Sequence, residues 1–152
     1  SISGHDKRRT LPDPTVPWIT KNVTLANNVF SQSTGDYVVQ VNDWSKEFKS
    51  SQMLTKSEGN LFHTASSSVP LVTWYPDAKT WTVYKTLAAY QSATGRDSSS
   101  TAVVGTSPLT AQFNLTSSYK SRASKALPIT TTIANSSSNL KKDAKVLGAV
   151  IP

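Results

Sequence analysis

The sequence predicts an all-β chain in which short strands stack as successive coils of a solenoid, with one short helix on the flank. The tripeptide Asn28-Val29-Phe30 returns about 32 residues later as Asn60-Leu61-Phe62, and a strand-like run follows each copy. Residues 84–100 contain the one good helix candidate. Asn, Ser and Thr, which suit bends between strands, fill much of the remaining chain. An antiparallel β-sandwich or jelly roll is the alternative fold.

Composition fits one domain of ordinary size. The chain has 152 residues, 37% hydrophobic and 16% charged, which is too apolar for a disordered chain. It has no Cys and only two His, so we expect neither disulfides nor a zinc site, and we expect no cofactor. No stretch approaches the roughly 18 apolar residues of a membrane span, so we expect no membrane partner. Because residue 1 is Ser rather than Met, we expect a processed piece of a longer chain.

The formal net charge of +7 allows several kinds of partner. The positive residues are scattered, and no basic stripe with interleaved aromatic residues appears, so direct nucleic-acid binding is not expected. An acidic polysaccharide, or simple solubility, explains the charge equally well.

Local patterns place the elements in order. Residues 1–17 carry three prolines and predict an extended N-terminal segment, with a second unit at residues 18–152. Residues 37–41 form the best strand pattern, and shorter ones recur at 53–55, 69–75, 101–104 and 146–151. Leu87, Ala88, Tyr90 and Gln91 share one face of the predicted helix, and Gly95 suits its end. Residues 129–139, mostly Thr, Ser and Asn, predict a loop.

Five patterns follow one another along the chain. They are an Asn-Asn-apolar-Phe turn, a Gly-Asn-apolar-aromatic turn, a Trp-bearing strand, a helix reading Leu-Ala-x-Tyr-Gln-x-x-Thr-Gly-x-Asp-x-x-Ser, and a Tyr-containing segment before Leu-Gly-Ala. They lie at residues 27–30, 59–62, Trp74, 87–100 and 119–149. Their order resembles the C-terminal end of secreted bacterial right-handed parallel β-helix proteins, the pectate-lyase-like superfamily. The sequence departs from that pattern where Ala123-Ser124-Lys125-Ala126 replaces Gly-Ser-Pro-Ala.

The resemblance implies that residues 18–152 are the last coils of a right-handed parallel β-helix. An N-terminal segment or a second chain would complete the solenoid, since an open coil edge tends to pair. It also implies a secreted, carbohydrate-active protein that holds a polysaccharide in a groove on one sheet face. Because the resemblance is structural, it predicts the fold better than the reaction.

Catalysis in such a groove needs few residue types. Hydrolases use two carboxylates, whereas lyases use a base and cations that stabilise a sugar carboxylate. The catalytic candidates are Asp43, Asp36, His5 and Asp6, and the substrate-binding candidates are Trp44, Lys46, Arg8, Arg9 and Trp74.

Each candidate also has a structural interpretation. The Trp44 ring could stack on a sugar while Asp43 bonds to it or protonates it, or the pair could be a turn aspartate beside a packed Trp. The cluster from His5 to Arg9 is either a solvated segment or a turn that presents acid, base and cation to a substrate. His63, at a predicted turn, fits a hydrogen-bonded structural role better than a catalytic one.

Three functions are compatible with these patterns. The first, which we favour, is part of a secreted polysaccharide-degrading enzyme, a glycoside hydrolase or a polysaccharide lyase. The second is a non-catalytic carbohydrate-binding or adhesive solenoid end. The third is a viral or phage structural protein, since small, basic, Ser- and Thr-rich β chains occur in capsids.

Overall fold

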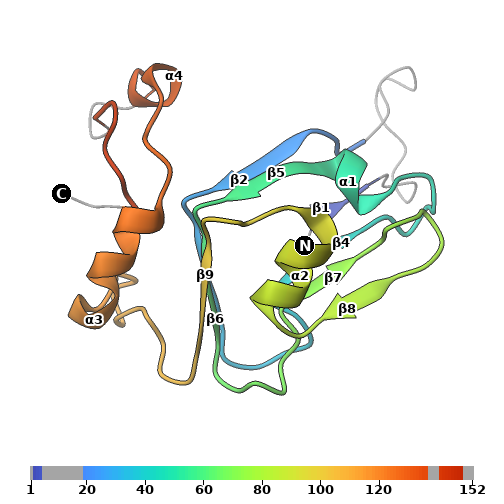
Figure 1. Ribbon diagram of the computed structural model, residues 1–152, viewed down its shortest axis with the longest axis horizontal. Coiled ribbons are helices and arrows are strands. Elements are labelled where there is room, and N and C mark those ends of the chain that lie inside the picture. Colours follow the sequence, from blue (N-terminus) through green and yellow to red (C-terminus); the bar gives the residue numbers. More distant parts are fainter. Residues whose placement is uncertain (1, 5–18, 137–140, 149–152) are drawn as a thin grey trace.

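The computed structural model describes residues 2–4, 19–136 and 141–148, and its short strands form three separate sheets (Figure 1). The strands are β1 (Ile2–Ser3), β2 (Val23–Ala26), β3 (Val29–Gln32), β4 (Val39–Asn42), β5 (Leu54–Glu58), β6 (Leu61–Thr64), β7 (Val72–Trp74), β8 (Thr82–Tyr84) and β9 (Thr101–Val104). The helices are α1 (Ser50–Met53), α2 (Leu87–Thr94), α3 (Ser117–Lys120) and α4 (Thr131–Ala134), and a 3-10 turn, η1 (Ser121–Lys125), follows α3.

Parallel pairing dominates the sheets. The strand orders are β1-β4-β7-β8, β2-β5 and β3-β6-β9, and every pair is parallel except β7 with β8, which is antiparallel. The two copies of the repeat lie side by side in register, with Val29 opposite Leu61 and Phe30 opposite Phe62. The two phenylalanine rings are in contact, with centroids 5.4 Å apart.

Asn60 explains why the two copies align. Its side-chain oxygen accepts the backbone N–H of Asn28 at 2.9 Å, and its side-chain nitrogen donates to Asp97, Ser57 and the carbonyl of Leu25. Asn60 is only 1% exposed, and a buried amide of this kind is costly unless it is fully bonded. The side chain therefore holds the β2–β3 turn, the β5–β6 turn and the start of β9 together.

The main core lies between the sheets. Val41 and Val72 from the β1-β4-β7-β8 sheet join Leu54, Phe62 and Tyr90 in one buried cluster. A second, smaller cluster contains Leu61, Ala126 and Leu147, and it joins the β3-β6-β9 sheet to the end of the chain. Burial of these apolar side chains is the main stabilising term for both clusters.

The helix prediction is confirmed. α2 begins after Thr86, whose side chain accepts the backbone N–H of Ala89, and it ends at Gly95, which has the left-handed φ of 68°. Leu87 and Tyr90 are buried as predicted, whereas Ala88, assigned to the same face, is exposed. The Tyr90 ring packs edge-on against Trp74, so the helix covers one end of the main core (Figure 1).

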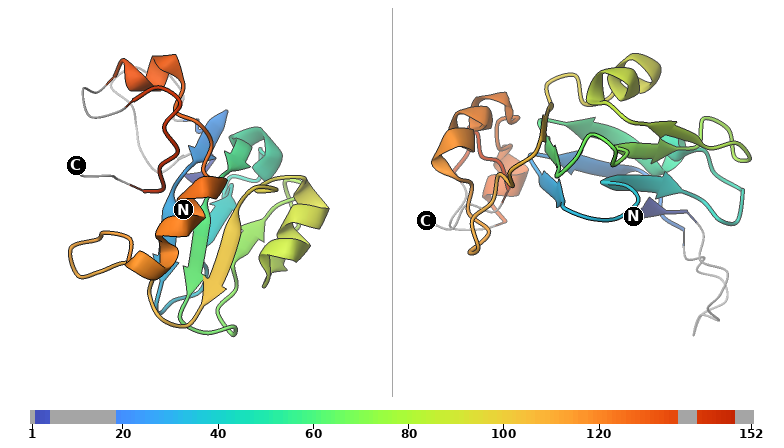
Figure 2. Two further views of the ribbon diagram at one scale, coloured as in Figure 1. Left: turned by 60° about the vertical axis from the view of Figure 1, so that its left-hand side comes forward. Right: turned by 90° about the horizontal axis from the view of Figure 1, so that it is seen from below.

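Residues 108–136 and 141–148, the C-terminal segment, lie beside the sheets rather than within them (Figure 2). This segment contains α3, η1 and α4 but no strand among its described residues. α4 lies within residues 129–139, for which the sequence predicts a loop. Thr130 caps α4 by accepting the backbone N–H of Ile133, so a hydroxyl-rich sequence begins a helical turn here. Of the predicted terminal strand, Leu147 is buried, and residues 149–151 lie outside the described part.

The predicted fold class is wrong, and so is its alternative. The described chain is a small mixed α/β structure with several short parallel and mixed sheets that do not close. Two local features separate it from an all-β, right-handed parallel β-helix. β8 reverses against β7, and hydroxyl-rich stretches after residue 115 form helical turns instead of strands. An antiparallel sandwich is excluded because five of the six strand pairs are parallel.

Candidate functional site

The predicted catalytic aspartate Asp43 holds a loop together. It follows β4 and is 1% exposed, and its carboxylate accepts the backbone N–H groups of Ser45, Glu47 and Phe48 at 2.8–3.0 Å. The hydroxyl of Ser45 donates to the same carboxylate. A carboxylate bonded in this way fixes the turn after the strand.

The other predicted site residues are dispersed. Asp36 lies in an exposed bend before β4, and Trp44 is 71% exposed beside the buried Asp43. Lys46 adopts a left-handed φ of 59° in the same loop as Trp44. Trp74 is 4% exposed in the main core, with the Arg96 guanidinium 4.8 Å from its ring centroid. His5, Asp6, Arg8 and Arg9 lie outside the described residues.

His63 bridges neighbouring strands of the β3-β6-β9 sheet. It is 1% exposed, and its Nε2 lies 2.8 Å from the carbonyl oxygen of Gly105. A carbonyl only accepts, so Nε2 carries the proton, and Nδ1 accepts the hydroxyl of Ser31 at 2.8 Å. Both ring nitrogens are satisfied in the neutral form, which suits the structural role that the sequence indicated.

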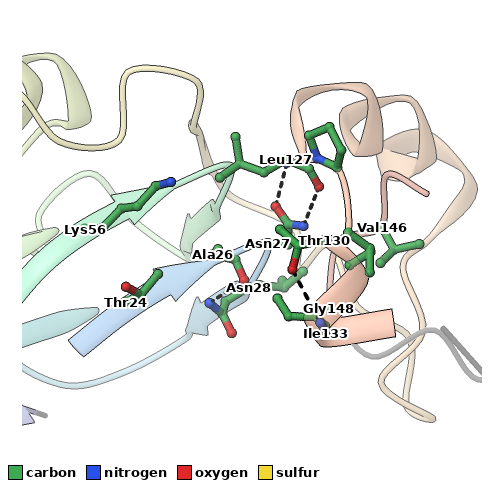
Figure 3. A pocket seen from close by; sticks show the side chains of 13 residues that line it. Thr24, Ala26, Asn27, Asn28, Lys56, Leu127, Thr130, Ile133, Val146 and Gly148 are labelled. Carbon is green, nitrogen blue, oxygen red and sulfur yellow. Dashed lines mark hydrogen bonds between the residues drawn. The ribbon is translucent and has the colours of Figure 1, made fainter. Parts of the chain in front are cut away.

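A cleft lies between the β2–β5 sheet and the C-terminal segment. It has a volume of about 770 Å³. Figure 3 shows Thr24 and Lys56 on the strands on one side, and Thr130, Ile133 and Val146 on the other. Thr24 and Lys56 are paired across β2 and β5, so both side chains leave the same face of that sheet.

Asn27 links the β2–β3 turn to the C-terminal segment, and both residues of this link line the cleft. Its side chain bonds in both directions to Leu127, accepting the backbone N–H at 2.7 Å and donating to the carbonyl at 2.8 Å. Its own carbonyl accepts the backbone N–H of Gly148 (Figure 3). Asn27 has a left-handed φ of 59°, a conformation that Asn tolerates better than most residues. One turn residue therefore anchors the C-terminal segment at two places, Leu127 and Gly148.

The cleft has apolar walls and one charge. Of the described residues that line it, only Lys56 is ionisable. Ala26, Val29, Leu127 and Ile133 supply apolar surface, while Thr24, Asn28 and Thr130 supply side chains that can form hydrogen bonds. Such a site can hold a molecule with one apolar face, several hydroxyl groups and a negative charge.

Sequence reasoning did not find this cleft. Its two walls are about 100 residues apart in the chain, as the Asn27–Leu127 pair shows. Lys56 stands alone among polar neighbours, and no local spacing marks it. The repeat located Asn28 as a turn residue but gave no reason to place Thr130 or Val146 opposite it.

A candidate metal centre and a membrane-spanning helix are absent from the described ranges. No group of three or more His, Cys, Asp or Glu side chains there could hold a metal ion. No helix in these ranges is long and apolar enough to cross a membrane.

No protein-family model, no curated protein and no solved structure matches the chain. The residues that line the cleft are therefore the basis for assigning a function.

Proposed function

We propose that the cleft between the β2–β5 sheet and the C-terminal segment binds a uronic-acid unit of an acidic polysaccharide. The observation that carries this proposal is the position of Lys56, the one cation among the described lining residues, near hydroxyl-bearing side chains and apolar walls. A sugar ring has an apolar face and a rim of hydroxyl groups, and a uronic acid adds a carboxylate. That carboxylate would pair with the Lys56 ammonium, and Thr24 and Thr130 would bond to the sugar hydroxyls.

Binding is better supported than cleavage within the described residues. Cleavage by hydrolysis needs two carboxyl groups facing the bond to be broken. Asp43 is bonded within its own loop, Asp36 is exposed in a separate bend, and none of the described residues that line the cleft is acidic. We therefore favour a carbohydrate-binding role, with degradation of the polysaccharide as the second candidate. The net charge of +7 favours an acidic ligand in both cases.

Titration calorimetry with a trigalacturonate tests the proposal against maltotriose, a neutral oligosaccharide of equal length. We expect the acidic ligand to bind and Lys56→Gln to weaken it about tenfold, the effect of losing one charge-assisted contact worth about 1.4 kcal/mol. Binding should also weaken as salt concentration rises. Lys79→Gln, in the loop before β8, is the matched control and should leave the affinity unchanged.

Two results would reject the proposal. One is equal affinity for both trisaccharides, and the other is equal affinity of the Lys56→Gln and unmodified chains for trigalacturonate. Release of shorter products during the titration would favour the degrading enzyme over the binding protein.

A polypeptide that adds a strand to β3 remains a second predicted partner, because the described sheet has no neighbour on that side.

A further inference from the structure

A second, smaller cavity lies between α2 and the sheet that contains β6 and β9. It has a volume of about 160 Å³. Its lining includes four polar side chains, from Thr64, Ser67, Lys85 and Thr86, and several apolar ones, including Leu71, Leu87 and Val104. None of these residues lines the larger cleft beside β2 and β5.

The Thr64 side chain lines this cavity, and its hydroxyl has no hydrogen-bond partner among the described residues. Phe62 belongs to the same core cluster as Leu71 and Leu87, and Thr64, two residues further along β6, faces the same side. Its side chain is 3% exposed, and no residue that the structure describes forms a hydrogen bond with its hydroxyl. A ligand that accepts a hydrogen bond from this hydroxyl would gain that contact.

The first turn of α2 adds donors and positive potential. Thr86 accepts the backbone N–H groups of Ala89, through its hydroxyl, and Tyr90, through its carbonyl. The N–H groups of Leu87 and Ala88 come earlier in the helix and have no partner within it. The first turn contains no acidic residue, and Lys85 lies directly before the cap. This end of the cavity therefore favours an anion.

The other side chains that line the cavity include several apolar ones. Leu71 and Leu87 are buried core residues, whereas Val104, which lines the same cavity, is 59% exposed. A closed apolar cavity of about 150 Å³ accommodates one benzene ring in another protein, so this volume suits a body of five or six carbon atoms. A bare tetrahedral anion would leave the apolar side chains uncovered.

We propose that this cavity binds a small carboxylic acid with a branched or aromatic body. The carboxylate lies between Lys85 and the first N–H groups of α2, and it accepts the hydroxyl of Thr64. The apolar body covers Leu71, Leu87 and Val104. The ligand is distinct from a polysaccharide in size and in the apolar area that it buries.

The test is an NMR titration of the 15N-labelled chain with 3-methylbutanoate, against its uncharged isostere 3-methylbutanamide and against inorganic phosphate. We expect the acid to shift the amide signals of Leu87 and Ala88 and to bind at least about fivefold more tightly than the amide. Lys85→Gln and Thr64→Val should each weaken the acid about threefold to tenfold. Lys79 and Lys56 do not line this cavity, so Lys79→Gln and Lys56→Gln should leave the affinity for the acid unchanged.

Three outcomes would overturn the proposal. They are equal binding of acid and amide, phosphate binding as tightly as the acid, and an absence of shifts at Leu87 and Ala88. If Thr64→Val fails to fold, Lys85→Gln decides, because Lys85 is exposed and its loss removes no core contact. Unchanged affinity in the Lys85→Gln chain then rejects the site.

Discussion

Single polar side chains with several backbone partners shape this protein at the residue scale. Asp43 gathers the N–H groups of its own loop, while Asn60 bonds to turns that are up to 37 residues away. Each fixes a bend that the backbone alone would leave with unpaired groups. Of these two residues, the sequence predicted a catalytic role for Asp43 and a turn position for Asn60. Their bonds show that they serve the turns.

Glu58 gives a pH-dependent stability that can be measured. Burial raises the pKa of its carboxyl group, but the backbone N–H and hydroxyl of Ser99 and those of Ser98 donate to the carboxylate, and together they hold the pKa below its usual value. A lowered pKa means that the stabilisation is present above the unfolded-state pKa of about 4.3 and is lost as pH falls through the folded-state value.

Glu58→Gln removes this charge, so the variant should be less stable than the unmodified chain at pH 7. We expect a difference of up to about 1 kcal/mol, since the carboxylate is partly exposed and solvent weakens its contacts. The difference should shrink as pH falls below the unfolded-state pKa of about 4.3 and through the lower folded-state pKa. Urea unfolding at several pH values between 3 and 7 measures it. A difference that stays constant over this range would contradict the role given to the carboxylate.

Each element depends on both local signals and neighbours. Thr86 and Gly95 bracket α2, so the helix can be predicted from a few adjacent residues. The strands are only two to five residues long, and each is stabilised chiefly by its partner in the sheet. The turns between them use left-handed residues, including Asn27, Gly59 and Asp97.

Two glycines allow the stability cost of backbone strain to be separated from the cost of a steric clash. Gly59 and Gly95 have nearly the same left-handed φ, 67° and 68°. A Cβ at Gly95 would meet nothing within 4 Å, whereas at Gly59 it would lie 2.7 Å from the Asn27 side-chain oxygen and 3.0 Å from the Leu127 nitrogen. Gly95→Ala should therefore cost only the backbone strain, about 1 kcal/mol, and Gly59→Ala about 2 to 3 kcal/mol.

Thermal and urea unfolding of the two variants measure this difference. Gly59→Ala should also increase amide hydrogen exchange at Leu127, because its contact with Asn27 is disturbed. Gly95→Ala serves as the control for that exchange. Equal losses of stability in both variants would show that the C-terminal segment does not press on the β5–β6 turn.

At the scale of the whole molecule, β3 forms an edge of its sheet among the described strands. Leu61 donates its N–H to Asn28 and Ala65 donates to Gln32, so the even-numbered residues of this strand bond toward β6. Alternation in a parallel pair then directs the backbone groups of Val29 and Ser31 away from β6. Among the described strands β3 has a neighbour on one side only, and such an edge is a template for another strand.

We expect the isolated chain to self-associate, or to bind a polypeptide that adds a parallel strand to β3. Light scattering coupled to size-exclusion chromatography measures the association over a range of concentrations. Val29→Pro leaves the β3–β6 bonds in place, because Val29 faces the open edge, and Pro has no N–H to offer there. It should reduce association. A stable, monodisperse monomer at all concentrations would contradict this prediction.

The sequence by itself determined the features that depend on neighbouring residues or on a repeat. It marked α2 through its cap and terminal glycine, and it marked the two Asn-apolar-Phe turns, which lie in register because Asn60 bonds to Asn28. Only the tertiary structure decided that β8 reverses, that the sheets stay separate and that Asp43 serves its loop. It alone formed the cleft, because Lys56 and Thr130 face each other only after Asn27 binds Leu127 across about 100 residues. Contacts at that separation leave no local pattern in a single sequence, since packing and chain entropy select them together.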